Sequence, residues 1–536
     1  MNTITKTLTV LIFLPLVLSG AATQAEPIAP PIDTPIPEDQ PVAVELKEWT
    51  QHEWTHPGRS LYRDKGDFYD LSCLMRDAKG RLQRCPAFSS YVEIASGFDD
   101  LIGVWYNEDT AHWHVLGTYN SMITTIATDD DWDELETVGN IQNLLAAIDT
   151  LGGLIGRNYS FWGGDLYIIG DDKKVYRGSP ALGQAYLSEL DGGGDVVLLC
   201  PYGDRMYAAT DTGTIMRLTD ADDGFDDFYD PVGDLQVVYM AGIKEYLAVV
   251  TIDPTGNLII HKLDPTTAPT KVLDELGSLD FGTPSTNGAF FVTVGDNIYL
   301  SPGSQLMPDD QVEIPIYRFN GSRENDAIIS HVTTLVLETG TGYGAGYTAD
   351  TSVGLLNWRG RLVLYALPNP SGSAVTHTLH VLTGDGFTTL ATTTCSAAMT
   401  TPIAVTAGGE IIVGNEDGGS EHGFKHFGNS GGLQDGYLQT SYLDMGSPGK
   451  EKRLNRISVI LNDEATGFKI VIKYRTDDTT SWTTATTANG TRHATIDITA
   501  PNTFYTIQLK IELDDDTGNN EDIRIDALSV IYSIDE

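Results

Sequence analysis

Short apolar runs separated by polar turns recur along most of the chain. The clearest signature is an apolar or aromatic residue, a two-residue turn that contains Gly, and a second apolar run. It appears as WGGDLY at 162–167, YGDRMY at 202–207 and VGDNIY at 294–299, and more loosely as WRGRLV at 358–363. Apolar and polar positions alternate without a helical period, which is typical of β-strands joined by tight turns. The sequence therefore predicts an all-β fold.

The signature returns along the chain between residues 98 and 430. Its glycines are about 40 residues apart early and about 50 to 65 apart later, and a period in this range is typical of β-propellers. One small sheet cannot bury both of its faces alone, whereas blades packed around an axis bury each other's faces. We predict a six- or seven-bladed β-propeller. A stack of β-sandwiches and a β-solenoid are the alternatives.

A different pattern begins near Gly431. The strands that follow are longer, alternate with period two and are separated by polar turns. They are expected at 437–443, 457–461, 468–474, 494–498, 504–513 and 523–532. This pattern predicts a jelly-roll-like β-sandwich. We place the propeller, with an N-terminal hairpin lead-in, at 60–430 and the sandwich at 431–536.

The first 59 residues differ from both regions. Lys6 precedes an apolar run at 8–18, and small residues up to Ala25 follow. This is the order found in export signals, and a run of about eleven residues is too short to span a bilayer. The alternative for 1–25 is a buried element of an intracellular or virion protein. Residues 26–59 begin with a stretch rich in Pro and acidic residues, which predicts an extended linker or arm. No later stretch is expected to span a membrane.

The length of the chain indicates how many domains to expect, and its net charge limits the partners it can bind. A chain of 536 residues is too long for one hydrophobic core, so more than one domain is expected. The 33 Lys and Arg residues face 74 Asp and Glu residues, giving a net charge of −41. Such a surface repels phosphate backbones, so we expect no sequence-specific binding of nucleic acid. It would suit a saline environment, or a channel through which DNA slides without adhering.

One motif matches a zinc protease. His52-Glu53-Trp54-Thr55-His56 has the HExxH pattern, which binds zinc when both histidines lie on one face of a helix. Pro57 and Gly58 would end such a helix at once, so we predict no metalloprotease. Other catalytic motifs, including the nucleophile elbow and the P-loop, are absent from the sequence. We therefore assign no catalytic residue.

An acidic segment at 514–522 is a candidate calcium loop. Asp514, Asp516 and Asp522 surround Gly518 and offer the oxygen ligands that calcium prefers. A solvated hairpin turn is the alternative. No other cofactor is expected.

Two cysteines lie nearly symmetrically about the turn at 77–80. One hairpin would place Cys73 opposite Cys85, and a disulfide would suit an exported protein. Two thiols are the alternative.

Three aromatic residues of the predicted sandwich are candidates for binding sugars by stacking. They are Tyr474, Trp482 and Tyr505. Packing in the core is the alternative for each of them.

Two flanking segments carry a resemblance to a known family. Residues 60–71 (SLYRDKGDFYDL) and 77–88 (DAKGRLQRCPAF) are similar to the opening of phage tail-associated propeller proteins, such as the nozzle or hub proteins of short-tailed phages. In that opening a Gly follows the Pro at the end of the hairpin. Here Ala87 follows Pro86 instead, and Cys85 replaces the residue that usually precedes the Pro. Residues 438–449 (LQTSYLDMGSPG) and 473–478 (KYRTDD) look like the sandwich appended to such propellers.

The resemblance implies a non-enzymatic structural protein of the virion. The propeller would be an assembly hub or nozzle in a homo-oligomeric ring of tail proteins, and the sandwich would contact a neighbouring protein or a host-surface glycan. The export-like N-terminus departs from this family. An exported bacterial surface propeller that binds glycan or protein, secreted or held at the cell surface, is therefore the alternative. An exported hydrolase is a third.

Overall fold

Every regular element that the structure describes is a β-strand. The computed structural model describes most residues between 43 and 534; residues 1–42 and several connecting stretches, including 142–158 and 339–351, lie outside the description. The signal-like segment 1–25 is thus outside it. The prediction of an all-β fold is confirmed.

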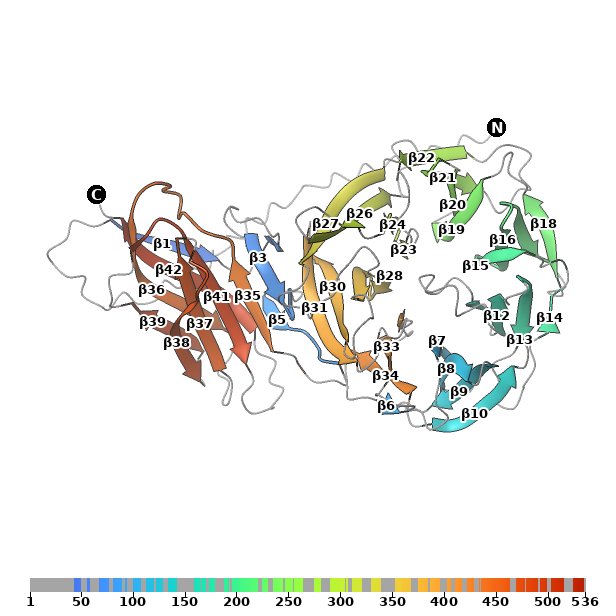
Figure 1. Ribbon diagram of the computed structural model, residues 1–536, viewed down its shortest axis with the longest axis horizontal. Helices are drawn as coiled ribbons and strands as arrows, with labels where there is room; N and C mark the ends of the chain where they lie inside the picture. The colour runs from blue at the N-terminus through green and yellow to red at the C-terminus, as the bar shows by residue number, and fades with distance from the viewer. Residues whose placement is uncertain are drawn as a thin grey trace, which may run out of the picture.

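Within the described residues, seven antiparallel groups of strands follow one another along the chain and lie around a common centre (Figure 1). The first four groups are β7 (Asp100–Asn107), β8 (His112–Tyr119), β9 (Met122–Thr128) and β10 (Glu134–Ile141); β11 (Tyr159–Trp162), β12 (Asp165–Ile169), β13 (Val175–Gly178) and β14 (Ser188–Glu189); β15 (Val196–Tyr202), β16 (Arg205–Thr210), β17 (Ile215–Leu218) and β18 (Phe225–Tyr229); and β19 (Gln236–Ile243), β20 (Tyr246–Ile252), β21 (Asn257–Leu263) and β22 (Asp274–Asp280). The other three are β23 (Phe290–Val294), β24 (Asn297–Ser301), β25 (Gln305–Leu306), β26 (Gln311–Asn320) and β27 (Ile329–Glu338); β28 (Ser352–Trp358), β29 (Arg361–Leu367), β30 (Val375–Thr383) and β31 (Gly386–Cys395); and β32 (Ile403–Val405), β33 (Ile411–Glu416), β34 (His422–Phe427) and β6 (Val92–Glu93). We call these seven groups the ring sheets.

The last ring sheet includes one strand from the N-terminal part of the chain. β6 precedes the first ring sheet, yet it pairs antiparallel with β34, with Val92 opposite Phe424. Segments more than 300 residues apart in sequence therefore complete one sheet.

The repeated sequence signature forms the first hairpin of four ring sheets. Tyr202 pairs with Arg205 around Gly203, and Val294 pairs with Asn297 around Gly295. Both glycines have φ of 60°, a conformation that glycine reaches without a steric penalty and that a type II′ hairpin turn requires at its first central position. Two-residue turns also join Trp162 to Asp165, where Gly163 has φ of 62°, and Trp358 to Arg361, where both Arg359 and Gly360 have positive φ, as in a type I′ turn.

Neighbouring ring sheets pack face to face. Because successive side chains of a strand point to opposite faces, β15 sends Leu199 toward the sheet of β11–β14 and sends Leu198 and Cys200 toward the sheet of β19–β22. Shared cores also join β19–β22 to β23–β27, β23–β27 to β28–β31, and β28–β31 to β32–β34. The four sheets β15–β18, β19–β22, β23–β27 and β28–β31 each contribute to two of these cores and are therefore buried on both faces.

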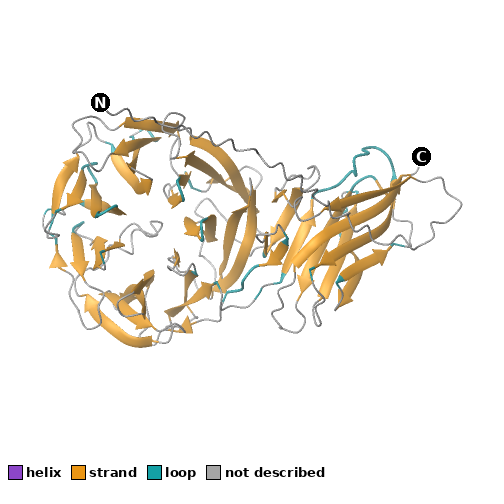
Figure 2. Cartoon of the chain, turned by 180° about the vertical axis from the view of Figure 1, so that it is seen from behind, coloured by secondary structure: helices purple, strands orange, loops and turns teal. Residues whose placement is uncertain are grey.

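Two further sheets, which we call the sandwich, lie beside the ring sheets (Figures 1 and 2). The first sheet has the order β39-β36-β42-β5-β4, with β1 added to β42 and β40 added to β36. Its strands are β1 (Ala43–Trp49), β4 (Leu74–Arg76), β5 (Leu82–Arg84), β36 (Lys452–Leu461), β39 (His493–Asp497), β40 (Thr503–Phe504) and β42 (Arg524–Ile534).

The second sandwich sheet has the order β3-β35-β41-β37-β38, with β2 added to β3. Its strands are β2 (Thr55–Pro57), β3 (Asp67–Ser72), β35 (Gly436–Thr440), β37 (Lys469–Thr476), β38 (Thr483–Asn489) and β41 (Ile507–Asp514). Apolar side chains from both sheets share one core, in which Leu438, Ile472 and Leu509 face Leu454, Ile457 and Leu528. The second sheet also continues into the ring, because β3 pairs with β31 through Ser72 and Thr389.

The N-terminal hairpin of β4 and β5 lies between the two regions. Leu74 and Leu82 enter the core of the sandwich, whereas Met75 and Cys85 enter the core shared by the last two ring sheets. Arg84 is 2% exposed and donates hydrogen bonds to the carbonyl oxygen of Leu433 and to the Asp435 carboxylate. The hairpin predicted as a lead-in to the propeller is thus also part of the sandwich.

Part of the predicted linker at 26–59 forms strands. β1 pairs along its whole length with β42, with Ala43 opposite Ile534 and Trp49 opposite Leu528. The sequence after Pro41 carries no proline until Pro57 and alternates apolar with charged residues from Val44 to Lys47, which suits a strand. β2 contains Thr55 and His56, so the second histidine of the HExxH motif lies in a strand and not on the helix that a zinc site of this kind needs.

Candidate binding face

One face of the sandwich carries an unusual group of cations. In β37 the buried residues Ile470, Ile472 and Tyr474 point into the core, so the residues between them point outward. On the neighbouring strand β41, Leu509 and Ile511 point inward by the same rule. The outward charged residues of the two strands are Lys469, Lys473, Arg475, Lys510, Glu512 and Asp514. We call these six residues the basic face, since four cations and two carboxylates leave a surplus of two positive charges.

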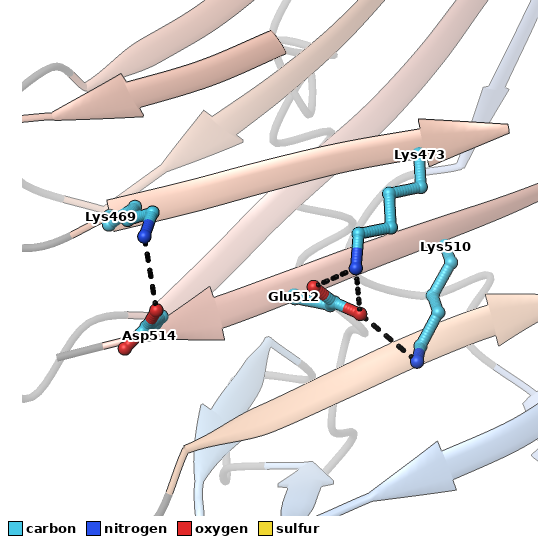
Figure 3. Close-up of polar contacts among 5 residues, drawn as sticks. All are labelled: Lys469, Lys473, Lys510, Glu512 and Asp514. Carbon is cyan, nitrogen blue, oxygen red and sulfur yellow. Dashed lines mark hydrogen bonds and ion pairs between the residues drawn. The ribbon is translucent and has the colours of Figure 1, made fainter. Parts of the chain in front are cut away.

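Two lysines contact the carboxylate of Glu512, and one contacts that of Asp514 (Figure 3). Lys473 Nζ lies 2.8 Å and 2.7 Å from the two oxygens of Glu512, and Lys510 Nζ lies 3.0 Å from Oε1. Lys469 Nζ lies 3.4 Å from Asp514 Oδ2. The lysines come from β37 and β41, which pair antiparallel with Lys473 opposite Lys510.

The two lysines set the protonation of Glu512. Partial burial of the carboxylate raises its pKa, but hydrogen bonds and Coulomb attraction from Lys473 and Lys510 outweigh that effect. The net pKa of Glu512 is therefore below its ordinary value, and the group is ionised at neutral pH.

Arg475 is held by a separate set of contacts. Its guanidinium carbon lies 4.7 Å from the centre of the Trp482 ring and 5.4 Å from that of Tyr442. Nε donates to Gln508 Oε1 at 2.5 Å, and Nη1 donates to the carbonyl oxygen of Thr480 at 3.4 Å. Gln508 is fully buried and donates its own amide to the carbonyl of Thr440. Two ring contacts and two hydrogen bonds thus fix the side chain of Arg475.

The guanidinium keeps hydrogen-bonding capacity after these contacts. An arginine carries five N–H donors in a planar fork, and within the described residues Nη2 of Arg475 has no hydrogen-bond partner. The arrangement can donate to an anionic group from outside the chain.

An exposed tyrosine, Tyr505, lies in a turn that contacts the strand of Arg475. Tyr505 is 50% exposed, the highest exposure of a large apolar side chain within the described residues. Its backbone N–H and that of Thr506 donate to Asp477 Oδ1 at 2.8 Å and 2.9 Å. Asp477 is two residues along the chain from Arg475, so this contact ties the Tyr505 turn to the strand that carries the arginine.

A buried lysine holds the other side of that turn. Lys452 Nζ donates to the carbonyl oxygens of Lys450 at 2.8 Å and Tyr505 at 3.0 Å. Burial lowers the pKa of Lys452, while the nearby Asp444 and Asp477 act in the opposite direction. Tyr505 is therefore presented on a fixed backbone.

The three aromatic residues proposed from the sequence differ in position. Tyr474 is 7% exposed and belongs to the core of the sandwich, so it does not present a ring for stacking. Tyr474 follows Ile470 and Ile472 at every second position, and this pattern in the sequence could have predicted that it is buried with them. Trp482 is half-buried against Arg475, and Tyr505 is exposed. The four cations of the basic face were not predicted as site residues, although each lies next to a buried residue of β37 or β41 and could have been placed on the outward face.

The candidate calcium ligands are described only in part. Asp514 is at the end of β41 beside Lys469, whereas Asp516 and Asp522 lie outside the described residues. Within the residues that the structure describes, no group of three or more His, Cys, Asp or Glu side chains is placed to hold a metal ion. A calcium site at 514–522 stays a prediction.

The two hairpin cysteines lie close together as thiols. The backbone N–H of Cys85 donates to the carbonyl oxygen of Cys73 at 2.8 Å, and both side chains are buried. The sulfur atoms are not joined in a disulfide. Burial, and to a smaller extent the neighbouring Cys73, raises the pKa of the Cys85 thiol well above its ordinary value. The structure thus has the thiols that were the alternative to a disulfide.

No model of a known protein family and no curated protein matches this chain. Two solved structures that resemble it are the crystal structure of a mitotic checkpoint complex and that of the computationally designed Ika8 protein. The first is 10% identical, covers 64% of this chain and 94% of its own, and has a TM-score of 0.40. The second is 9% identical, covers 64% and 99%, and has a TM-score of 0.35. Scores this low do not assign the chain to a family.

In the part of the chain that the structure describes, no helix is long and apolar enough to cross a membrane.

Proposed function

We propose that the chain is a non-enzymatic structural protein of a phage or prophage tail. In this proposal the ring sheets are a seven-bladed β-propeller that acts as an assembly hub or nozzle. The sandwich, of jelly-roll type, contacts a neighbouring tail protein or a host-surface glycan. The observation that carries the proposal is the face-to-face packing of successive ring sheets together with the pairing of β6 with β34.

Packing of this kind supports a propeller. Each blade of a propeller packs against its neighbours, and closing the ring requires segments from the two ends of the repeat region to meet. β15 sends alternate side chains into two different cores, and β6 completes the sheet of β32–β34. Such a ring is rigid, which suits a part of a larger assembly.

The charge distribution supports a role in assembly and recognition rather than in binding nucleic acid. A net charge of −41 repels DNA and would let it pass through a channel formed by several copies. The basic face is an exception on the sandwich, next to an exposed tyrosine, and gives this region a surface suited to contact with another molecule.

The second candidate is an exported bacterial surface propeller that binds glycan or protein. The apolar run at 8–18, preceded by Lys6 and followed by small residues, favours it. In that case the ring would present the sandwich outside the cell, and the mature chain would begin near residue 26.

Purified particles test the proposal directly. Phage induced from the host would be purified by density gradient, analysed by mass spectrometry and imaged with an antibody against the sandwich. We expect the full-length chain in the particle, at a fixed number of copies, with the antibody at the tail. A chain absent from particles, and found in the medium with its N-terminus near Ala25, would contradict the tail assignment and support the exported protein.

A further inference from the structure

We propose that the basic face is a binding site for acidic glycans, in which Arg475 binds a carboxylate or phosphate group. This inference rests on the recognition role given to the sandwich in the proposed function, and it holds equally for a tail protein and for an exported one. It names the ligand chemistry, the side chains that meet it and the end of the sandwich where it binds.

The charge of the face selects an anion. The whole chain carries more than twice as many acidic as basic residues, yet four of its 33 cations stand on adjacent strands of one sheet. Lys473 and Lys510 share one carboxylate, so their charge is only half neutralised. An anion that reaches this face therefore meets an attractive local field on a molecule that otherwise repels it.

Arg475 provides the specific contact. Arginine recognises carboxylate and phosphate through parallel hydrogen bonds, which are among the strongest in proteins. Here two aromatic rings and Gln508 already fix the guanidinium, so little side-chain entropy is lost when a ligand binds. Nη2 remains able to donate.

Aromatic side chains beside the cation point to a sugar as the carrier of the anionic group. Trp482 lies against Arg475, and the turn of Tyr505 is tied through Asp477 to the same strand. Aromatic rings offer an apolar surface with a polar edge, which suits the mixed apolar and hydroxyl surface of a sugar ring.

Binding by the full-length chain to defined polymers tests the proposal. The probes are polygalacturonate for carboxylate, a glycerol-phosphate teichoic acid for phosphate, and fully methyl-esterified polygalacturonate as the neutral match of the first. We expect at least one acidic polymer to bind, the neutral polymer to bind at least 10-fold more weakly, and binding to weaken as salt rises. The two acidic arms show whether carboxylate or phosphate is preferred.

Variants locate the site. Arg475→Gln removes the charge and should weaken binding of the acidic polymer at least 10-fold, and Arg475→Lys should fall between it and the unchanged protein because lysine keeps the charge but not the fork. Arg217→Gln is the matched control, since Arg217 lies 4.7 Å from the Phe228 ring but is in a ring sheet. The control should bind as the unchanged protein does. Circular dichroism and a melting curve show that each variant is folded.

Three results would overturn the proposal. One is no binding of either acidic polymer, and another is equal binding of the neutral polymer. The third is a glycan-free dimer that dissociates in the Arg475→Gln variant, which would mean that the face contacts a second copy. If the chain is absent from particles while acidic polymers bind through Arg475, the tail assignment fails and this inference stands.

Discussion

The ring sheets and the sandwich use the same strand alternation with different results. In β15, both sets of alternate side chains are buried, one against each neighbouring sheet. In β37, one set fills the core of the sandwich and the other carries Lys469, Lys473 and Arg475 to the surface. A substitution at almost any position of a strand such as β15 therefore alters one of the two cores. The outward face of β37 can change its chemistry while the fold stays, so recognition is better placed on the sandwich.

The hairpin of β4 and β5 is an exception, because it belongs to both regions. Leu74 enters the sandwich core and Met75, the next residue, enters a ring core. The pairing of β3 with β31 adds a second connection. The two regions are thus joined by packed strands rather than by a flexible linker alone.

Core truncations should have the largest effect on stability. Phe427 is fully buried between the Trp358 and Phe88 rings, and Leu509 is fully buried in the sandwich. Phe427→Ala should lower the free energy of unfolding by about 3–5 kcal/mol and Leu509→Ala by about 2–5 kcal/mol. Urea unfolding measures the loss, and hydrogen exchange shows where it occurs. Phe427→Ala should first expose amides of β29 and β33, and Leu509→Ala those of β37. Equal loss of protection in both regions for each variant would mean that they unfold as one unit.

The junction between the regions should respond next. Arg84→Ala removes a buried guanidinium that binds Leu433 and Asp435. Since Asp435 is largely exposed and can regain water, the expected loss is about 1–3 kcal/mol. The control is Lys174→Ala, which removes an exposed ion pair with Glu189 within one ring sheet and should cost less than about 1 kcal/mol. If urea unfolding gives the control the larger loss, the hairpin does not stabilise the junction.

A ring turn should give a smaller effect. Gly203→Ala places a Cβ at φ of 60°, and we expect a loss of about 1 kcal/mol because of backbone strain and not of crowding. The space around the position is open, with nothing within 4 Å of an added Cβ. Asp204→Ala, at the next turn position, should change the melting temperature little. Similar losses for both variants would argue against the turn geometry as the cause.

Local patterns predicted local structure well. The two-residue turns at Gly203 and Gly295 join strands of the expected kind, because turn chemistry depends on neighbouring residues only. Pairings between distant segments could not be read in the same way. Nothing near Val92 indicates that it pairs with Phe424, and nothing near Ala43 names Ile534 as its partner. Arg475 could have been placed on the surface by its alternation with Tyr474. Its fixation by Gln508 depends on strand pairing, which the sequence alone does not give.

The smallest expected effect concerns pH and the basic face. The pKa of Glu512 is lowered in the folded chain by Lys473 and Lys510. A carboxylate with a lowered pKa stabilises the fold above its unfolded pKa, which is about 4.3, and this contribution is lost as the pH falls through the folded value. Glu512→Gln should therefore be less stable than the unchanged protein by about 1 kcal/mol or less at pH 7, and the difference should disappear at lower pH.

Melting curves of both proteins between pH 7 and pH 3 measure this difference, with Asp514→Asn as the control because its carboxylate meets one lysine at 3.4 Å. A difference that stays constant with pH would show that Glu512 acts through packing and not through charge. Glu512→Gln also tests whether the outward face of the sandwich can change its chemistry without a change in the ring sheets. Removing the carboxylate that Lys473 and Lys510 share raises the surplus positive charge of the basic face, so an acidic polymer should bind more tightly, whereas the packing of the ring sheets should not change.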